Sequence, residues 1–368
     1  MRKTFLVLLG FLALVLFSFL VYLAYQYFFR PDDFSYQRSY PSVLKGVLDP
    51  GPADAARLVT TELENIRLLG ANTIYVYVDY SYEGGKFQYT SGGGRPADQS
   101  QNEQDYINLI KLIKQQGLAV HLATSFGGGE NSQFGVPLET LLKDIQEVDL
   151  KWAAIGEQYQ VETYAPSSEI DYQIFREYYG ADWEDTAGHR EAAETSNRYH
   201  SDILPQLREV FKGKLIYQAG LYSAYLGSAG YDIFGQGVNN VGVELADWRG
   251  KVQELFGYAQ TNARRQGSGW LVTELWLPVY GRGEVPNQPG PALKTPSGVP
   301  LPQLQDQFYQ IVFEEYLAWD GEIKPSGLAF TAYLNPLMAV KDQPAESVIR
   351  EFFQKLPDSI AGGLNFVD

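Results

Sequence analysis

The chain has 368 residues, of which 45% are hydrophobic and 14% aromatic, and its 29 Lys and Arg against 44 Asp and Glu give a net charge of −15. This balance argues against a nucleic-acid-binding protein, which needs a basic surface, and the apolar content argues against a disordered chain. Cysteine is absent, which excludes disulfides, thiolate catalysis and cysteine-based zinc sites, and three histidines leave little for a histidine-rich metal site.

An uncharged stretch from Thr4 to Phe29 follows Arg2 and Lys3. It exceeds the ~20 apolar residues that a helix needs to cross a bilayer, and aromatic residues crowd its outer end, as at a lipid–water interface. The positive charges before it place the N-terminus in the cytoplasm and the rest of the chain outside.

The sequence therefore predicts three parts. They are a transmembrane anchor at the cell membrane over residues 1–30, a polar linker over 31–43 and an extracytoplasmic domain over 44–368. The alternative is a cleaved signal peptide and a secreted protein. Such a peptide has a shorter apolar core, ~7–15 residues, and ends in small residues, whereas this stretch ends in bulky aromatic ones.

From residue 44 onward, short apolar strands alternate with amphipathic helices, which is typical of parallel α/β structure. Predicted strands cover residues 45–49, 74–78, 118–126, 161–164, 215–219, 231–238, 270–275 and 328–334. Predicted helices cover residues 52–69, a segment around 106–113 that ends before Gly117, and residues 138–158, 197–211, 249–266, 303–319 and 346–356.

Eight strands, seven of them followed by a helix, predict a closed (β/α)8 TIM barrel, preceded by the one transmembrane helix. The active site of such a barrel lies where the strands end and the following loops begin. An open doubly wound sheet is the alternative. It would usually carry a Gly-rich nucleotide-binding turn after the first strand, and the sequence from Leu48 to Pro52 has none.

Two glutamates lie at predicted strand ends. Glu169 comes just after the fourth strand, and Glu274 lies at the end of the seventh among core-type residues. Burying a charge there is costly unless the group is paired or functional. Glycoside hydrolysis needs two facing acids, one ionised to attack the sugar carbon and one protonated to donate to the leaving oxygen. Either glutamate alone could be a structural ion-pair partner or a loop charge. Two glutamates at the ends of the fourth and seventh strands indicate catalysis more specifically than either one alone.

Segments near these glutamates resemble one clan of enzymes. Residues 66–76, Ile-Arg-Leu-Leu-Gly-Ala-Asn-Thr-Ile-Tyr-Val, resemble the passage from helix to second strand in retaining (β/α)8 glycoside hydrolases. Residues 214–219 and 231–235 are similar to strands five and six of the mannanase-like and galactanase-like members of this clan. The resemblance covers most of residues 42–356. It implies that Glu274 is the nucleophile and Glu169 the acid/base.

The chain departs from the clan at four positions. Ser168 stands where many members have an Asn that binds the sugar 2-hydroxyl, and residues 75–82 lack the strand-two Arg that braces the nucleophile. Phe234 on strand six has no hydroxyl to donate to the nucleophile, and Tyr333 stands where a Trp platform is frequent.

Several other side chains near the predicted strand ends are candidates for contacting sugar, because aromatic faces stack on sugar rings and polar groups bind hydroxyls. The substrate-binding candidates are Tyr164, Ser168, His121, Trp276, Tyr333 and Asn335. For His121, a role as a core histidine is slightly favoured over a sugar contact. Lys45, Asp49 and Asp79 are each equally explained as solvated strand ends.

The sequence thus predicts a membrane-anchored, extracytoplasmic, retaining glycoside hydrolase that cleaves a β-linked oligo- or polysaccharide. We expect no metal, no organic cofactor and no protein partner. The alternative from another class is a tethered barrel that binds glycan without cutting it, because loss of a bracing cation would raise the pKa of the nucleophile. A barrel hydrolase acting on an ester or amide ranks below both, since the chain lacks a Gly-x-Ser-x-Gly elbow.

Overall fold

The computed structural model describes residues 35–83, 85–90, 102–128, 134–179, 186–220, 230–239, 243, 245–277, 301–335 and 338–356. The chain divides into two compact units, Met1–Gln37 and Arg38–Asp368, and every helix and strand given below belongs to the second. The predicted membrane segment lies outside the described residues. Within the ranges just given, no helix is long and apolar enough to cross a membrane. The predicted anchor, linker and domain boundaries stay predictions.

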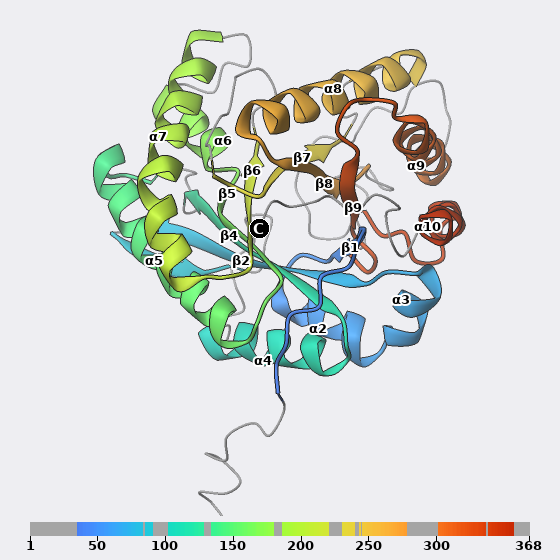
Figure 1. Ribbon diagram of the computed structural model, residues 1–368, viewed down its shortest axis with the longest axis horizontal. Helices are drawn as coiled ribbons and strands as arrows, with labels where there is room; N and C mark the ends of the chain where they lie inside the picture. The colour runs from blue at the N-terminus through green and yellow to red at the C-terminus, as the bar shows by residue number, and fades with distance from the viewer. Residues whose placement is uncertain are drawn as a thin grey trace, which may run out of the picture. The chain divides into compact units, whose positions relative to one another are not determined.

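Eight parallel strands form a closed barrel with helices around it (Figure 1). The strands follow the order β1-β9-β8-β7-β6-β5-β4-β2, and pairing of β1 with β2 closes the ring. This closure confirms the (β/α)8 barrel and excludes the open sheet. The barrel strands are β1 (Leu44–Leu48), β2 (Thr73–Glu83), β4 (Ala119–Gly128), β5 (Thr163–Ser168), β6 (Lys214–Ala219), β7 (Ile233–Val238), β8 (Gly269–Leu275) and β9 (Pro325–Thr331).

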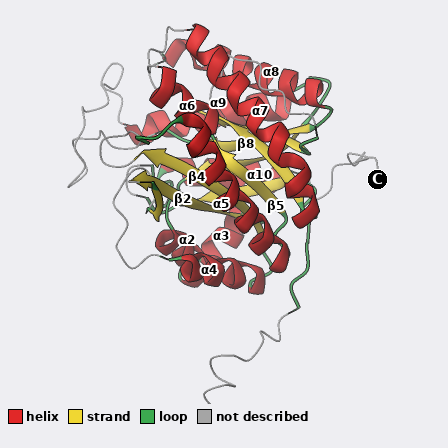
Figure 2. Ribbon diagram, turned by 90° about the vertical axis from the view of Figure 1, so that its left-hand side faces the viewer, coloured by secondary structure: helices red, strands yellow, loops and turns green. Residues whose placement is uncertain are grey.

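The helices cover the outside of the strands (Figure 2). They are α2 (Pro52–Thr60), α3 (Leu63–Leu69), α4 (Glu103–Gln115), α5 (Leu138–Gln158), α6 (Ile170–Ile174), α7 (Thr186–Val210), α8 (Trp248–Gln266), α9 (Leu301–Ala318) and α10 (Pro344–Lys355). A π-helical turn, η1 (Phe175–Tyr179), follows α6, and a short 3-10 helix, η2 (Leu245–Asp247), precedes α8. The sequence analysis did not predict α6 or η1.

The single helix predicted over 52–69 is instead two helices. The hydroxyls of Thr60 and Thr61 donate to carbonyls one turn back, and the N–H groups of Thr61 and Glu62 both donate to the carbonyl of Arg57. β-Branched threonines that bond to the backbone in this way weaken a helix, so α2 ends there.

Strand β2 is longer than predicted and turns back into an unpredicted strand, β3 (Lys86–Tyr89). The two pair in antiparallel fashion, with Tyr80 opposite Tyr89 and Tyr82 opposite Phe87. Their ring centroids lie 4.7 and 4.8 Å apart. Aromatic cross-strand pairs of this kind stabilise a hairpin, which here adds a strand to the end of β2 on the edge opposite β4.

The barrel interior is a packed core, separate from the core between strands and helices. It is formed by small and medium side chains around Tyr75, namely Leu44, Leu48, Ala123, Ala165, Ile216, Ile233, Leu271 and Ala329. Gly46 has no room for a side chain, because a Cβ there would lie 2.5 Å from the Tyr75 ring and 2.7 Å from Cβ of Ala329. Side chains alternate along each strand, so this layer defines which residues point inward.

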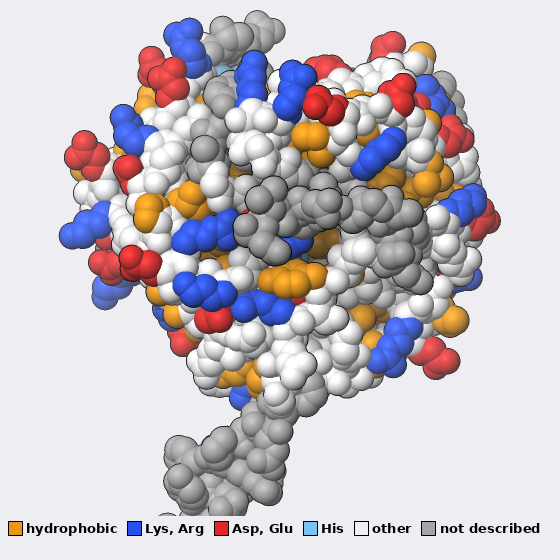
Figure 3. Space-filling view, viewed as in Figure 1, with side chains coloured by type: hydrophobic (Ala, Val, Ile, Leu, Met, Phe, Trp, Pro, Cys, Tyr) orange, Lys and Arg blue, Asp and Glu red, His pale blue; other side chains and the backbone are white. Residues whose placement is uncertain are grey.

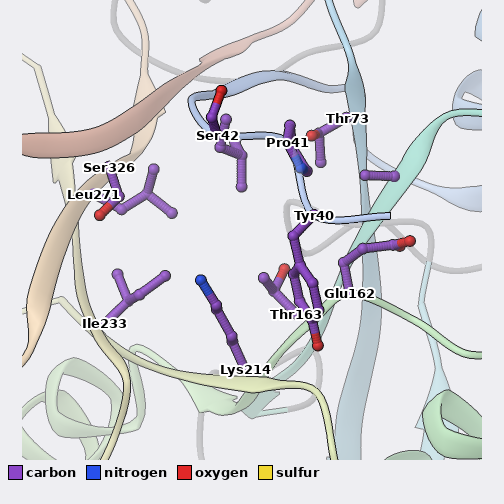
Figure 4. A pocket seen from close by; sticks show the side chains of 12 residues that line it. Tyr40, Pro41, Ser42, Thr73, Glu162, Thr163, Lys214, Ile233, Leu271 and Ser326 are labelled. Carbon is purple, nitrogen blue, oxygen red and sulfur yellow. The ribbon is translucent and has the colours of Figure 1, made fainter. Parts of the chain in front are cut away.

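The amino ends of the strands surround a small cavity of about 40 Å³, which residues Tyr40 to Ser42 cover (Figure 4). Lys214, the first residue of β6, points into it alongside Ile233 and Leu271. A volume of this size holds a few water molecules but no sugar ring. On the face in Figure 3, acidic and basic side chains are interspersed among the described residues.

Candidate active site

Glu274 points into the barrel mouth because of a bulge in β8. The register pairs Gln236 of β7 with Val272, and then Gly237 with Glu274, so Thr273 has no partner. A bulge inserts one residue and redirects the side chain that follows it. As a result, Oε1 of Glu274 accepts a hydrogen bond of 3.3 Å from Nε2 of Gln218 on β6.

A second bulge precedes Glu169. Ala123 of β4 pairs with Ala165, and Ser125 pairs with Ser168, so β5 has one residue more than β4 between these pairs. Ser167 and Glu169 both have positive φ, +47° and +57°, which side-chain-bearing residues adopt rarely. The N–H of Glu169 donates to the carbonyl of Gln218 at 3.1 Å. Gln218 therefore contacts both glutamates, one through its backbone and one through its side chain.

The glycine after β6 makes room for Glu169. A Cβ on Gly220 would lie 2.9 Å from Cβ of Glu169 and 2.7 Å from Cβ of Tyr172. The N–H of Gly220 donates to both carboxylate oxygens of buried Asp171, at 3.0 and 3.2 Å. The segment that carries Glu169 is thus held closely against the end of β6.

The two glutamates have different electrostatic environments. Burial raises the pKa of Glu169 well above its ordinary value, and the negative charges of Glu274 and Asp171 raise it further. Burial also raises the pKa of Glu274, but hydrogen bonds from Tyr77 and Gln218 lower it. The two carboxyl groups thus lie within electrostatic reach of each other. Charges add to burial at Glu169, whereas neutral donors oppose burial at Glu274, so the proton is favoured on Glu169.

Tyr77 and Gln218 support Glu274, and sequence reasoning missed both. Nε2 of Gln218 donates to the Tyr77 hydroxyl at 2.6 Å. Burial and the charge of Glu274 raise the pKa of Tyr77 well above its ordinary value, so its hydroxyl remains a donor. The available signals were the alternation of Tyr75, Tyr77 and Asp79 on one face of β2, and one amide within the apolar run of β6.

Asp79 is a third acid at the mouth. It lies opposite Ser125 in the register of β2 with β4. Burial raises its pKa to about 7, a hydrogen bond from Ser125 lowers the pKa, and the charge of Glu274 raises it. Asp79 is thus placed within the electrostatic reach of Glu274.

No protein-family model matches the sequence, and no curated protein matches it. Solved structures do match its fold. One is a GH113 β-1,4-mannanase complex, 14% identical, with a TM-score of 0.56 over 86% of this chain and 100% of that one. The fold is that of known glycoside hydrolases.

Two further solved structures have a similar fold. The endo-β-1,4-mannanase from Thermotoga petrophila is 11% identical, with a TM-score of 0.54 over 86% of this chain and 77% of that one. The glycoside hydrolase family 5 mannosidase from Rhizomucor miehei is 10% identical, with a TM-score of 0.53 over 85% and 93%. The resemblance inferred from the sequence is confirmed for the fold, which is all that such identities establish.

Three of the predicted sugar contacts lie at the carboxyl end of the barrel. Ser168 immediately precedes Glu169 and pairs with Ser125. Trp276 follows β8, is partly exposed, and donates its backbone N–H to the carbonyl of Val238 at 3.3 Å. Asn335 follows β9, and its backbone N–H donates to Asp49 at 3.0 Å.

The structure does not bring Tyr164 or Tyr333 to the mouth. Ala165 faces the barrel interior, so its neighbour Tyr164 faces outward, where its hydroxyl donates to the carbonyl of Asp149 at 3.0 Å. Tyr333 packs in the outer core, and its hydroxyl donates to Glu346 of α10 at 3.2 Å. Both are buried structural residues in this arrangement.

His121 lies inside the barrel, but below the glutamates. Its ring is tilted against that of Tyr75, with 4.2 Å between centroids, and Nδ1 lies 2.9 Å from the hydroxyl of Thr163, the first residue of β5. Burial lowers its pKa to about 3, so the ring is neutral. This placement agrees with the alternative of a core histidine.

Lys45 of β1 and Asp49, which follows this strand, have structural partners. Nζ of Lys45 donates to the carbonyl of Leu356 at 3.2 Å. Asp49 accepts from the N–H groups of Tyr333, Leu334 and Asn335. Among the residues that the structure describes, no group of three or more His, Asp and Glu side chains is arranged to hold a metal ion.

Proposed function

We propose that this protein is a retaining glycoside hydrolase, with Glu274 as the nucleophile and Glu169 as the acid/base. The observation that carries the proposal is the pair of bulged strand ends. They direct two carboxyl groups into one mouth, where the charge of one raises the pKa of the other. Such a coupled pair of acids matches the requirements of glycoside hydrolysis.

The reaction has two steps. First, a carboxylate oxygen of Glu274 bonds to the anomeric carbon, the bond to the leaving oxygen breaks, and the proton of Glu169 passes to that oxygen. Then Glu169 removes a proton from water, the water oxygen bonds to the anomeric carbon, and the ester to Glu274 breaks. Hydrogen bonds from Tyr77 and Gln218 favour the ionised form of Glu274 that the attack requires, against the effect of burial.

We propose a β-linked oligo- or polysaccharide as the substrate. Two of the similar structures are described as β-1,4-mannanases and a third as a mannosidase. A β-1,4-mannan and its oligosaccharides are therefore the first members of a panel of glycans and aryl glycosides to test. Endo or exo action follows from the products of that panel.

Site variants test the chemistry. In Glu274→Ala and Glu169→Gln, turnover of a glycan should fall at least about 100-fold, because each removes a group that acts in the transition state. Glu254→Gln, an exposed carboxyl of α8, is the matched control and should keep full activity. Circular dichroism checks the fold, and proton NMR of the first product checks retention. Unchanged turnover in either site variant would discard the assignment.

A second candidate is a barrel that binds glycan without cutting it. Burial raises the pKa of Glu274, and the two groups that lower it are a tyrosine and an amide, neither of which is a cation. A nucleophile that stays protonated does not attack. Saturable glycan binding without product over long incubation would favour this candidate.

We also propose that residues 4–29 anchor the protein in the cell membrane, with the barrel outside. The chain has no cysteine, so single introduced thiols report sidedness. A membrane-impermeant maleimide should label Leu317→Cys, half-exposed on α9, in intact cells, and Lys3→Cys only after lysis. The reverse pattern would contradict this orientation, and release of the barrel into the medium would indicate cleavage.

A further inference from the structure

We propose that Asp149 positions the acid/base Glu169 by holding the bulge of β5 in shape. This inference rests on the proposed function. Asp149 lies on α5, outside the barrel, and is fully buried. It touches neither glutamate in the described contacts, so it would act through the backbone that leads to Glu169.

The carboxylate of Asp149 is the centre of a hydrogen-bond cluster. Oδ2 accepts from the hydroxyl of Ser167 at 2.5 Å and from that of Tyr199 at 2.7 Å. Oδ1 accepts from the hydroxyl of Thr124 at 2.5 Å, the hydroxyl of Tyr164 at 3.2 Å and the N–H of Ser167 at 3.1 Å. The donors come from β4, β5 and α7.

Ser167 is the point at which this cluster meets the catalytic segment. It contributes two of the five donors, its N–H and its hydroxyl, and its N–H also donates to the Thr124 hydroxyl at 2.9 Å. It has φ of +47° and lies two residues before Glu169. A backbone conformation of this kind persists only where the surroundings hold it. Asp149 and Thr124 are those surroundings.

The charge of Asp149 has no evident role in stability. A buried carboxylate is costly unless it is paired, and its partners in the described part of the chain are hydroxyls and an N–H group, with no Lys or Arg. Burial raises the pKa of Asp149, and the bonds from Ser167, Thr124 and Tyr199 lower it. An apolar residue would fill the same outer core, so we attribute the carboxylate to the geometry that it imposes on Ser167.

The effect should be specific to Glu169. The bulge of β5 leads to Glu169, whereas Glu274 lies on β8 and is supported by Tyr77 and Gln218. A displaced acid/base slows protonation of the leaving oxygen but leaves the attack of Glu274 intact. The loss of activity in such a variant therefore depends on the leaving group, because an acidic phenol departs without being protonated.

The experiment compares two substrates that share the sugar hydrolysed by the wild-type chain, a phenyl glycoside and a 2,4-dinitrophenyl glycoside. In the full-length Asp149→Asn variant, kcat/KM for the phenyl glycoside should fall about 10–100-fold, as expected for a misplacement of about 1 Å. For the dinitrophenyl glycoside it should stay within about threefold of wild type. Added azide should accelerate turnover of the variant on this second substrate and yield a glycosyl azide, since azide needs no base.

Two further variants keep the test decisive. Ser167→Ala removes one hydroxyl and should show the same dependence on the leaving group to a smaller degree, even if Asp149→Asn does not fold. Tyr199→Phe removes a donor to the same carboxylate from α7, together with a longer contact of 3.4 Å to the Ser167 hydroxyl, but it keeps both bonds from Ser167 to Asp149. Its dependence on the leaving group should therefore be weaker than that of Ser167→Ala. Equal losses on both substrates in Asp149→Asn and Ser167→Ala, or no loss in either, would overturn the inference.

The wild type and Glu169→Gln separate the inference from the proposed function. A wild-type chain without hydrolysis, or Glu169→Gln with full activity, would overturn the proposed function and the inference with it. If Glu169→Gln shows the leaving-group dependence and azide rescue while the Asp149 and Ser167 variants do not, only the inference fails.

Discussion

At the scale of single residues, the candidate site depends on neutral donors around a partly buried acid. Tyr77 comes from the second barrel strand and Gln218 from the fifth, and both lower the pKa of Glu274 against the effect of burial. The chain has no Arg at the strand-two positions where the resemblance implied a brace. Hydrogen bonds to a carboxylate favour its charged form, so a tyrosine and an amide provide part of what a cation would.

Removing the Tyr77 hydroxyl should therefore change the pH dependence of hydrolysis. In Tyr77→Phe the pKa of Glu274 rises, so the acidic limb of the kcat/KM profile moves to higher pH. At a pH on that limb, activity should fall about tenfold, the value of one hydrogen bond to a charged group. Tyr82→Phe is the matched control, because its hydroxyl bonds to Asp144 of α5 at 2.7 Å. An unchanged limb in Tyr77→Phe would show that Tyr77 does not tune Glu274.

At the scale of elements, local irregularities of the strands decide where the acids point. Both β5 and β8 carry a bulge just before the glutamate, and a regular strand would direct these side chains differently. Below the mouth, the barrel interior is tightly packed around Tyr75 and Gly46. Tyr75 in turn contacts the tilted ring of His121 and stacks on Tyr77 at 6.4 Å between centroids. The packing of this layer therefore supports the mouth from below.

Gly46→Ala should destabilise the barrel. The added Cβ would lie 2.5 Å from the Tyr75 ring and 2.7 Å from Ala329, so neighbouring strands have to shift. We expect a loss of about 1–3 kcal/mol in the free energy of unfolding. Gly257→Ala on α8 is the control, since no atom lies within 4 Å of the added Cβ, and helix propensity predicts a gain of up to ~1 kcal/mol. Urea unfolding measures both, and equal effects would contradict the packing argument.

At the scale of the whole molecule, Asp49 joins the two ends of the barrel. It follows the first strand, and its carboxylate accepts the N–H groups of three consecutive residues after the last strand, Tyr333 to Asn335. Burial nevertheless raises its pKa to about 7, against the lowering effect of these bonds. Closure of the ring is thus linked to the titration of one buried group.

This linkage predicts a pH-dependent stability. The folded-state pKa of about 7 lies above the ~3.9 of an unfolded Asp, so between these values the folded chain binds more protons. The contribution of Asp49 to the free energy of unfolding is complete below about pH 4 and is lost as pH rises through about 7. The total loss is at most about 4 kcal/mol.

Asp49→Asn lacks this titration. Thermal unfolding is measured from pH 4 to pH 8. The Tm of the variant should rise relative to that of the wild type as pH rises, in addition to any constant difference caused by altered hydrogen bonds. A difference in Tm that is independent of pH would contradict the linkage.

Strong periodic patterns explain what could be predicted. Helix α5 has the bounds that its apolar spacing indicates, residues 138–158, and all eight barrel strands overlap the predicted ones. The positions of Glu169 and Glu274 at strand ends follow from the same patterns. Short elements without a repeating apolar spacing, such as α6 and β3, gave no comparable signal, and two neighbouring threonines were enough to split α2 from α3.

The amino-acid sequence by itself determined the (β/α)8 architecture and the two strand ends that carry acids, because apolar periodicity acts locally along the chain. Only the tertiary structure decided which side chains meet at the mouth. Tyr164 and Tyr333 turned outward, Tyr77 and Gln218 turned inward, and two bulges directed the glutamates. Bulges and registers depend on the neighbouring strand, and burial and charge at Glu169 depend on groups remote in the chain, so neither can be derived from local sequence.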